Sequence, residues 1–177
     1  MLKSFNDHVL KLMDPKAAEK RDKAPSSSAP SKPSALLQVD GEAKRVKPII
    51  IVPQALTSVI TAHNALDFFA GAFVTTEERR KQGGPIDVEQ KYLRKIDGGH
   101  RPIEYRIVDN PLLLGEKEWD SVAAVFVTGQ LWQFKDWNDK KWANPSNLFS
   151  EVLGVHLMMS DSPVNPKVQE WNTTVSF

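Results

Sequence analysis

The chain has 177 residues and a formal net charge of +1; 41% of its residues are hydrophobic and none is cysteine. This is enough for one domain with an apolar core and appended segments. Without cysteine the chain can form neither a disulfide framework nor a thiolate metal site. No apolar run approaches the roughly 20 residues of a membrane-spanning helix. We therefore expect a soluble, intracellular protein with no membrane partner.

Charge is unevenly distributed along the chain. Residues 1–47 hold 10 Lys and Arg against 6 Asp and Glu, a net of +4, whereas residues 48–177 hold 13 against 16, a net of −3. Broad affinity for nucleic acid requires a clustered basic face. The acidic larger part therefore argues against strong direct binding to nucleic acid.

The first residues have the pattern of a short amphipathic helix that ends at Asp14-Pro15. Its apolar residues recur at spacings of three and four: Leu2, Phe5, Val9, Leu12 and Met13. A helix of this length is marginal alone in water. Residues 1–14 are therefore either a disordered tail or a helix that docks on a partner or on this chain, with Leu2, Phe5, Val9 and Leu12 as the docking residues.

Residues 15–47 read as a disordered linker rich in Ser, Pro and Lys, because residues 24–33 are low-complexity and bury too little surface to offset their ordering entropy. Lys44-Arg45-Val46-Lys47 is a small basic cluster beside it. Nuclear import or phosphate contact is one interpretation of this cluster, and a solvated linker end is the other.

Two apolar runs predict short strands that are buried on both faces, at Pro48–Pro53 and at Val122–Val127. Burial on both faces implies helices above and below the sheet, which is the three-layer α/β arrangement. Residues 48–177 then form one domain. Ligands of such open sheets usually sit beyond the carboxyl ends of the strands.

The segment after the first strand lies where a nucleotide hydrolase carries its phosphate loop. Here it reads Gln54-Ala55-Leu56-Thr57-Ser58, without glycine or lysine and with Pro53 in front. Phosphate binding needs backbone N–H groups freed by glycines and a lysine for charge. We therefore expect no nucleotide cofactor. A helix capped by Thr57 or Ser58 should follow through about Phe69, with Gly71 as its stop.

The middle of the domain predicts a charged loop at residues 77–84 and then an antiparallel hairpin. Ile86–Lys95 pairs with Pro102–Val108 in this prediction and turns at Asp97–His100, because apolar residues alternate on both sides. A helix over Val88–Lys95 is the alternative.

The C-terminal third predicts short alternating elements. They are a helical turn within Leu112–Ser121 carrying Trp119, an exposed loop at Asn138–Asn144, a helix from Asn144 or Ser146 to about Leu153 ended by Gly154, a strand at Val155–Met159, a helical turn at Pro166–Trp171 and a strand at Thr173–Phe177.

An ordered series of short motifs resembles the C-terminal domain of the parafibromin (cell division control protein) family, subunits of the RNA polymerase II-associated factor complex. The motifs are Pro48–Pro53, Thr57–Thr61, Asn64-Ala65, Phe73-Val74, Lys81–Gly83, Tyr105–Pro111, Trp119-Asp120, Val125–Val127, Gly129, Trp132–Lys135, Trp137, Val168-Gln169 and Trp171. The resemblance covers about residues 47–177.

This resemblance implies a Ras-like fold, related to the phosphate-loop nucleotide hydrolases but without nucleotide-binding residues: a mostly parallel sheet with one antiparallel hairpin. It also implies a nuclear role in transcription elongation, with contacts to other subunits of the complex, the phosphorylated polymerase tail, elongation factors and chromatin, and a link to histone modification. The resemblance implies that family domains continue into a C-terminal helix, which we expect to be missing here. We expect the apolar face so exposed to be covered by Leu2, Phe5, Val9 and Leu12 or by a partner.

The candidate partner-binding residues follow the central strand: Trp132, Gln133, Phe134, Lys135 and Trp137. Aromatic rings would supply contact area and Lys135 charge for phosphate; the alternative is that Trp132 and Phe134 belong to the core. Arg79, Arg80 and Lys81 are further candidates for phosphate contact, against a solvated charge run.

The sequence shows no catalytic constellation, and its four histidines lack ligand spacing, so we expect no enzyme activity and no metal. The leading hypothesis is a non-enzymatic docking module. A small hydrolase-like enzyme with an unrecognised site, or a structural fragment without independent partners, are the alternatives.

Overall fold

The computed structural model describes residues 47–83, 89–95, 102–137, 140–159, 161–163 and 165–176. The expected helix at residues 1–13, almost all of the expected linker and the hairpin turn at residues 97–100 lie outside the described residues. Among the described helices, none has both the length and the apolar character that crossing a membrane requires.

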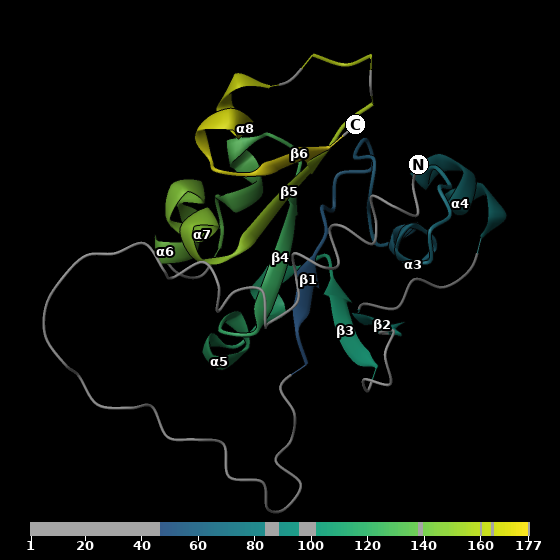
Figure 1. Ribbon diagram of the computed structural model, residues 1–177, viewed down its shortest axis with the longest axis horizontal. Helices are drawn as coiled ribbons and strands as arrows, with labels where there is room; N and C mark the ends of the chain where they lie inside the picture. The colour runs from purple at the N-terminus through teal and green to yellow at the C-terminus, as the bar shows by residue number, and fades with distance from the viewer. Residues whose placement is uncertain are drawn as a thin grey trace, which may run out of the picture.

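One sheet of six strands organises the domain, in the order β2-β3-β1-β4-β5-β6. The strands are β1 (Ile49–Ile51), β2 (Glu89–Arg94), β3 (Ile103–Val108), β4 (Val122–Val127), β5 (Leu153–Leu157) and β6 (Thr174–Ser176). Neighbouring strands are parallel except β2 and β3. This confirms the predicted Ras-like class, a mostly parallel sheet with one antiparallel hairpin (Figure 1).

The two apolar runs predicted as buried strands lie side by side. Ile50 pairs with Ala124 and Ile51 with Val125 in parallel register, and all three residues of β1 are buried. The helical alternative for Val88–Lys95 is wrong, because each residue of Glu89–Arg94 has an antiparallel partner in β3. The hairpin prediction is confirmed for this pair.

One face of the sheet is covered by a row of short helices, η1 (Pro111–Leu113), α5 (Glu116–Trp119), η2 (Leu131–Phe134), α6 (Lys140–Ala143), α7 (Pro145–Glu151) and α8 (Pro166–Glu170). Aromatic rings fill this layer. Trp119 stacks on Trp142 at 5.3 Å, and Phe134 meets both Trp137 and Trp171 edge to face at 4.9 and 5.6 Å. Stacked and edge-to-face ring contacts stabilise the fold beyond the effect of the apolar area that they bury.

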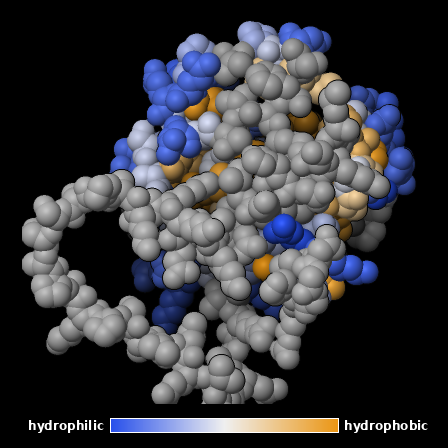
Figure 2. Space-filling model, viewed as in Figure 1, coloured by the Kyte–Doolittle hydropathy of each residue, from blue (hydrophilic) through white to orange (hydrophobic). Residues whose placement is uncertain are grey.

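Among the described residues, the other face is covered by the segment at residues 52–64 with α3 (Ala65–Phe69) and α4 (Thr76–Gln82). Phe68 and Phe69 pack there on Phe126 of β4. Leu153 and Leu157 of β5 are only partly buried against this cluster. In the space-filling view, hydrophilic residues gather at the rim and hydrophobic residues reach the surface between them (Figure 2).

The predicted helix from Thr57 or Ser58 is wrong over its first half, because α3 begins only at Ala65. Residues 57–61 are hydroxyl-bearing or β-branched, which are weak helix formers. The Asn64 side chain also holds them in turns, since its oxygen accepts from the Thr61 N–H at 2.8 Å and its amide donates to the Val59 carbonyl at 2.9 Å. Local side-chain bonds of this kind compete with a helix. Gly71, the predicted stop, has φ +85.

The predicted charged loop at residues 77–84 is instead α4 through Gln82. Thr75 and Glu78 form a capping box, with the Glu78 N–H donating to Thr75 Oγ1 at 3.2 Å and the Thr75 N–H to Glu78 Oε2 at 3.0 Å. This pattern of Thr followed three residues later by Glu is a helix-start signal in the sequence.

Two predictions in the C-terminal third also need correction. The expected exposed loop at Asn138–Asn144 contains α6, whose Trp142 is buried against Trp119. Gly154 does not end α7, which stops at Glu151, but lies within β5. A side chain there would come within 2.7 Å of Phe149 and Thr173.

The remaining C-terminal predictions are confirmed, with shifts at the ends. Asn144 caps α7 by accepting the Ser146 N–H at 3.0 Å, and Leu148 and Phe149 form its buried side. The predicted strand at Val155–Met159 is β5 two residues earlier. The turns at Leu112–Ser121 and Pro166–Trp171 appear as η1, α5 and α8, and the last strand as β6.

Candidate functional site

The carboxyl ends of β1, β3, β4 and β5 meet at one edge of the sheet, because these strands are parallel. The segments that leave them, residues 52–64, 109–114 and 128–137, enclose two hollows. Trp132 lines both. This edge is where open α/β sheets bind their ligands.

The predicted aromatic site divides between surface and core. Trp132 is 58% exposed, whereas Phe134 and Trp137 are 1% and 8% exposed and belong to the aromatic layer. Leu131, next to Trp132, is 53% exposed. Of the five residues proposed there, Trp132 and Lys135 face solvent, and the expected core alternative holds for Phe134 but not for Trp132.

Gln133 lies within the fold and fixes the turn that carries Trp132. Its side-chain oxygen accepts from the Thr128 N–H at 2.9 Å and from the Thr128 hydroxyl at 3.2 Å, and its amide donates to the Phe126 carbonyl at 2.9 Å. These bonds tie η2 to the end of β4. Gln133 also lines one of the two hollows, and its partner-binding role stays a prediction.

Gly129 makes the same turn possible. Its φ is +80, a conformation that residues with a side chain rarely adopt. A Cβ there would lie 2.9 Å from the Val168 side chain, and Asn165 donates to the Gly129 carbonyl at 2.9 Å. The turn after β4 is thus clamped from both sides, by Gln133 and by α8.

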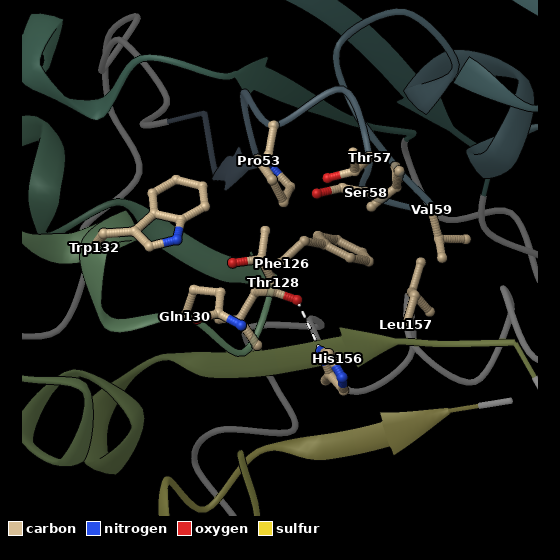
Figure 3. Close-up of a pocket in the computed structure, with 13 residues that line it drawn as sticks. Pro53, Thr57, Ser58, Val59, Phe126, Thr128, Gln130, Trp132, His156 and Leu157 are labelled. Atoms are coloured by element: carbon tan, nitrogen blue, oxygen red, sulfur yellow. Dashed lines mark hydrogen bonds between the residues drawn. The ribbon is translucent and has the colours of Figure 1, made fainter. Parts of the chain in front are cut away.

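The first hollow, of about 220 Å³, lies where a hydrolase would hold its phosphates, between residues 53–60 and the ends of β4 and β5. Figure 3 shows Pro53, Thr57, Ser58 and Trp132 around it. Among the described residues, its lining contains no lysine or arginine. The Ser58 N–H is already bonded to the Ala55 carbonyl at 2.9 Å. The lining therefore offers hydroxyl groups but not the charged, glycine-rich cradle that phosphate binding requires.

His156 forms the floor of the first hollow and has a structural hydrogen bond. Its Nδ1 lies 2.9 Å from the Val127 carbonyl, drawn as the dashed line in Figure 3. A carbonyl only accepts, so Nδ1 carries the hydrogen. The ring thereby links β5 to the end of β4.

The second hollow, of about 210 Å³, lies on the other side of Trp132, between Pro53, Pro111 and Leu112. In the described part of the chain, Asp109 and Asp136 are the charged residues of its lining. Sequence reasoning missed both, although Asp109 directly follows β3 and so had to lie at the ligand-binding edge.

The predicted basic residues on α4 are mostly engaged within the chain. Arg79 donates two hydrogen bonds to Asp67, at 2.6 and 2.8 Å, and Lys81 pairs with Glu77 at 2.7 Å. Arg80 is exposed. The three residues line neither hollow, so the structure does not bring them together with Trp132.

Arg106 of β3 binds Glu118 at 2.5 Å. This hydrogen bond, with a second from the Gly115 N–H, lowers the pKa of the Glu118 carboxyl below its ordinary value. The pair fastens α5 to β3. In the described part of the chain, His, Asp and Glu form no group of three suited to a metal ion.

Comparisons with known proteins agree on one family. The family model described as "RNA pol II accessory factor, Cdc73 family, C-terminal" matches residues 44–176. The chain is 34% identical over 149 residues to "Cell division cycle protein 73" of Caenorhabditis elegans, covering 83% of this chain and 28% of that protein. It is 32% identical over 131 residues to "Cell division control protein 73" of Saccharomyces cerevisiae, covering 72% and 32%.

A solved structure, "The conserved domain of yeast Cdc73", matches with a TM-score of 0.63 and 30% identity, over 73% of this chain and 80% of that one. The chain spans about a third of the length of these curated relatives, 28% and 32%. The matched residues 44–176 coincide with the range over which the motifs resemble the parafibromin family.

Proposed function

The chain belongs to the Cdc73 family of RNA polymerase II accessory factors, and from that premise we propose that its domain is a non-enzymatic docking module in transcription elongation. It would act in the nucleus, within the polymerase-associated factor complex. The ligand we propose is the phosphorylated tail of RNA polymerase II; segments of elongation factors and of chromatin proteins are the other outcomes of the test.

The observation that supports this proposal is the solvent-facing indole of Trp132 at the carboxyl edge. A tryptophan can bury some 150–250 Å² on binding, and interface energy is concentrated in such aromatic anchors. Here the ring stands between two hollows, on a turn that Gln133 and Asn165 hold in place. A preformed anchor loses little conformational entropy when a ligand packs on it.

Lys135 supplies positive charge close to the anchor. It is exposed three residues after Trp132, and among the described residues it forms no ion pair. An ammonium group on a flexible stem is well suited to meeting a phosphate as a point charge. This residue therefore favours a phosphorylated ligand over an unmodified one.

The expected test is pull-down from nuclear extract with the full chain, followed by competition with phosphorylated and unphosphorylated polymerase-tail peptides. Trp132→Ala should weaken capture by roughly 30-fold or more, as for an interface hot spot. Lys135→Glu should reduce the preference for the phosphorylated peptide. Leu93→Ala, which truncates a 54% exposed leucine on β2, is the matched control.

Unchanged capture by both Trp132→Ala and Lys135→Glu would contradict the proposal. A titration with labelled GTP and ATP distinguishes docking from the hydrolase alternative. The docking module should show no saturable binding at micromolar nucleotide, because none of the described residues that line the first hollow is a lysine or arginine.

Residues 1–13 keep their proposed role as a helix that docks on this chain or on a partner. Leu2, Phe5, Val9 and Leu12 would meet an apolar face, and the structure offers one where Leu153 and Leu157 are only partly buried.

A further inference from the structure

We propose that the second hollow receives a lysine or arginine side chain of the docked segment, between the carboxylates of Asp109 and Asp136 and the indole of Trp132. The inference rests on the proposed docking function and adds the chemical character of the ligand: a segment with a cationic residue beside the one that packs on Trp132. The partner is thus a protein segment with basic residues.

The two carboxylates converge on the hollow from different parts of the chain. Asp109 follows β3, and Asp136 follows η2. Among the described residues neither forms an ion pair, whereas Asp67, Glu104 and Glu118 each lie within 2.7 Å of a cation. The cation that would complement this pair is therefore not supplied by the described residues.

The other walls suit a long side chain with a charged end. Pro53, Pro111 and Leu112 provide apolar surface for the methylene stem of a lysine or arginine. The indole of Trp132 provides a π face, which attracts a cation electrostatically. A hollow of about 210 Å³ has the room of several water molecules at ~30 Å³ each, enough for one such side chain.

The charged residues of the two linings favour a cation in the second hollow rather than in the first. Counting the described residues alone, the first hollow has no Asp or Glu in its lining, and the second has no Lys, Arg or His. Residues 48–177 carry 13 basic and 16 acidic residues, so their net charge of −3 also attracts basic segments over longer range. A phosphate in the second hollow would be repelled by both carboxylates.

The two proposals place two oppositely charged residues of one ligand at different positions of this edge. A phosphorylated residue would lie at Lys135, which is not among the residues that line the second hollow, and a basic residue would lie within that hollow. The structure thus favours a ligand that carries both signs of charge.

The test uses the full chain on immobilised nonapeptide pools whose central residue is fixed and whose other positions are degenerate. The central residue is lysine, arginine, norleucine or glutamate. We expect the chain to bind the lysine and arginine pools about fivefold more than the norleucine pool, and the glutamate pool least. The preference should weaken between low and high salt.

The double variant Asp109→Asn, Asp136→Asn should reduce this ratio to about one. The control variant Glu116→Gln, Asp120→Asn also removes two negative charges, from α5 and its C-cap, which precede β4 and therefore lie at the opposite edge of the sheet. It should retain most of the preference, because the effect is local. All four residues are outside the buried core, and thermal unfolding should confirm that both variants fold.

Equal binding to the lysine, arginine and norleucine pools would overturn the inference, and so would equal losses in the two double variants. Trp132→Ala in the pull-down tests the docking function separately. If Trp132→Ala abolishes capture while the pools show no cationic preference, docking stands and the present inference fails. If the pools show the preference but Trp132→Ala leaves capture intact, the docking proposal fails.

Discussion

Gln133→Leu tests whether the presentation of Trp132 depends on the hydrogen bonds of one side chain, which also lines the second hollow. Leucine is one atom shorter than glutamine and has no amide. The Thr128 N–H and the Phe126 carbonyl then lose their partners at 2.9 Å each. A buried polar group left unpaired costs about 1–3 kcal/mol.

The magnitude follows from the partial burial of this turn. Thr128 and Gln133 are neither fully buried nor exposed, so water can reach part of the gap and the lower end of the range applies. Two orphaned groups at about 1 kcal/mol each predict a loss of about 2 kcal/mol. For a domain of this size that lowers Tm by roughly 5–10 °C.

Urea unfolding measures this loss directly, as a shift of the midpoint at constant slope. Gln130→Leu is the control, because Gln130 is exposed three residues away and has no side-chain capping bond. It should change stability by less than about 0.5 kcal/mol. Gln133→Leu should also weaken docking although Trp132 is intact. Equal stability of the two variants would refute the role assigned to Gln133.

Three further outcomes are expected. Glu118 has a lowered pKa in the folded state because of Arg106, so its contribution to stability is present above the ordinary value of about 4.3 and is lost as the pH falls through the folded value. Glu118→Gln should therefore reduce the loss of stability between about pH 5 and 3, by less than about 1 kcal/mol because the carboxyl is partly exposed. An unchanged dependence of stability on pH would count against the Arg106–Glu118 pair. Gly154→Ala should destabilise the domain by about 1–3 kcal/mol, measured by thermal unfolding, because the added Cβ would come too close to Phe149 and Thr173. An unchanged stability would mean that β5 can shift to make room for the Cβ. Deletion of residues 1–13 should lower Tm or cause aggregation if that segment covers Leu153 and Leu157, whereas unchanged melting without aggregation would exclude docking on its own chain.

The sheet was predictable from sequence because its signals are local. Ile49–Ile51 and Val122–Val127 are continuous apolar runs, and the alternation around Tyr105 predicts the hairpin. The helix expected from Thr57 was wrong because the Asn64 side chain holds this segment in turns. Its amide group bonds to the backbone of Thr61, Val59 and Val74, and these bonds outweigh the helical spacing of the apolar residues. Helix α4 was missed although Thr75 and Glu78 carry its start signal.

The candidate site was predictable only in part. The exposed indole was found because an aromatic turn follows a buried strand, but Phe134 and Trp132 could not be told apart without the helices that bury one of them. Asp109 and Asp136 are 27 residues apart in sequence and meet only through strand order. Convergence of this kind depends on the topology of the sheet, which no local pattern contains.

The aromatic layer leaves the protein with a built-in optical reporter. Of its five tryptophans, Trp119, Trp137, Trp142 and Trp171 are at most 8% exposed, whereas Trp132 is 58% exposed. A collisional quencher dissolved in water therefore reaches essentially one indole in the native domain. Any molecule that shields this ring will protect emission from quenching, so occupancy of the edge can be followed in the unlabelled chain.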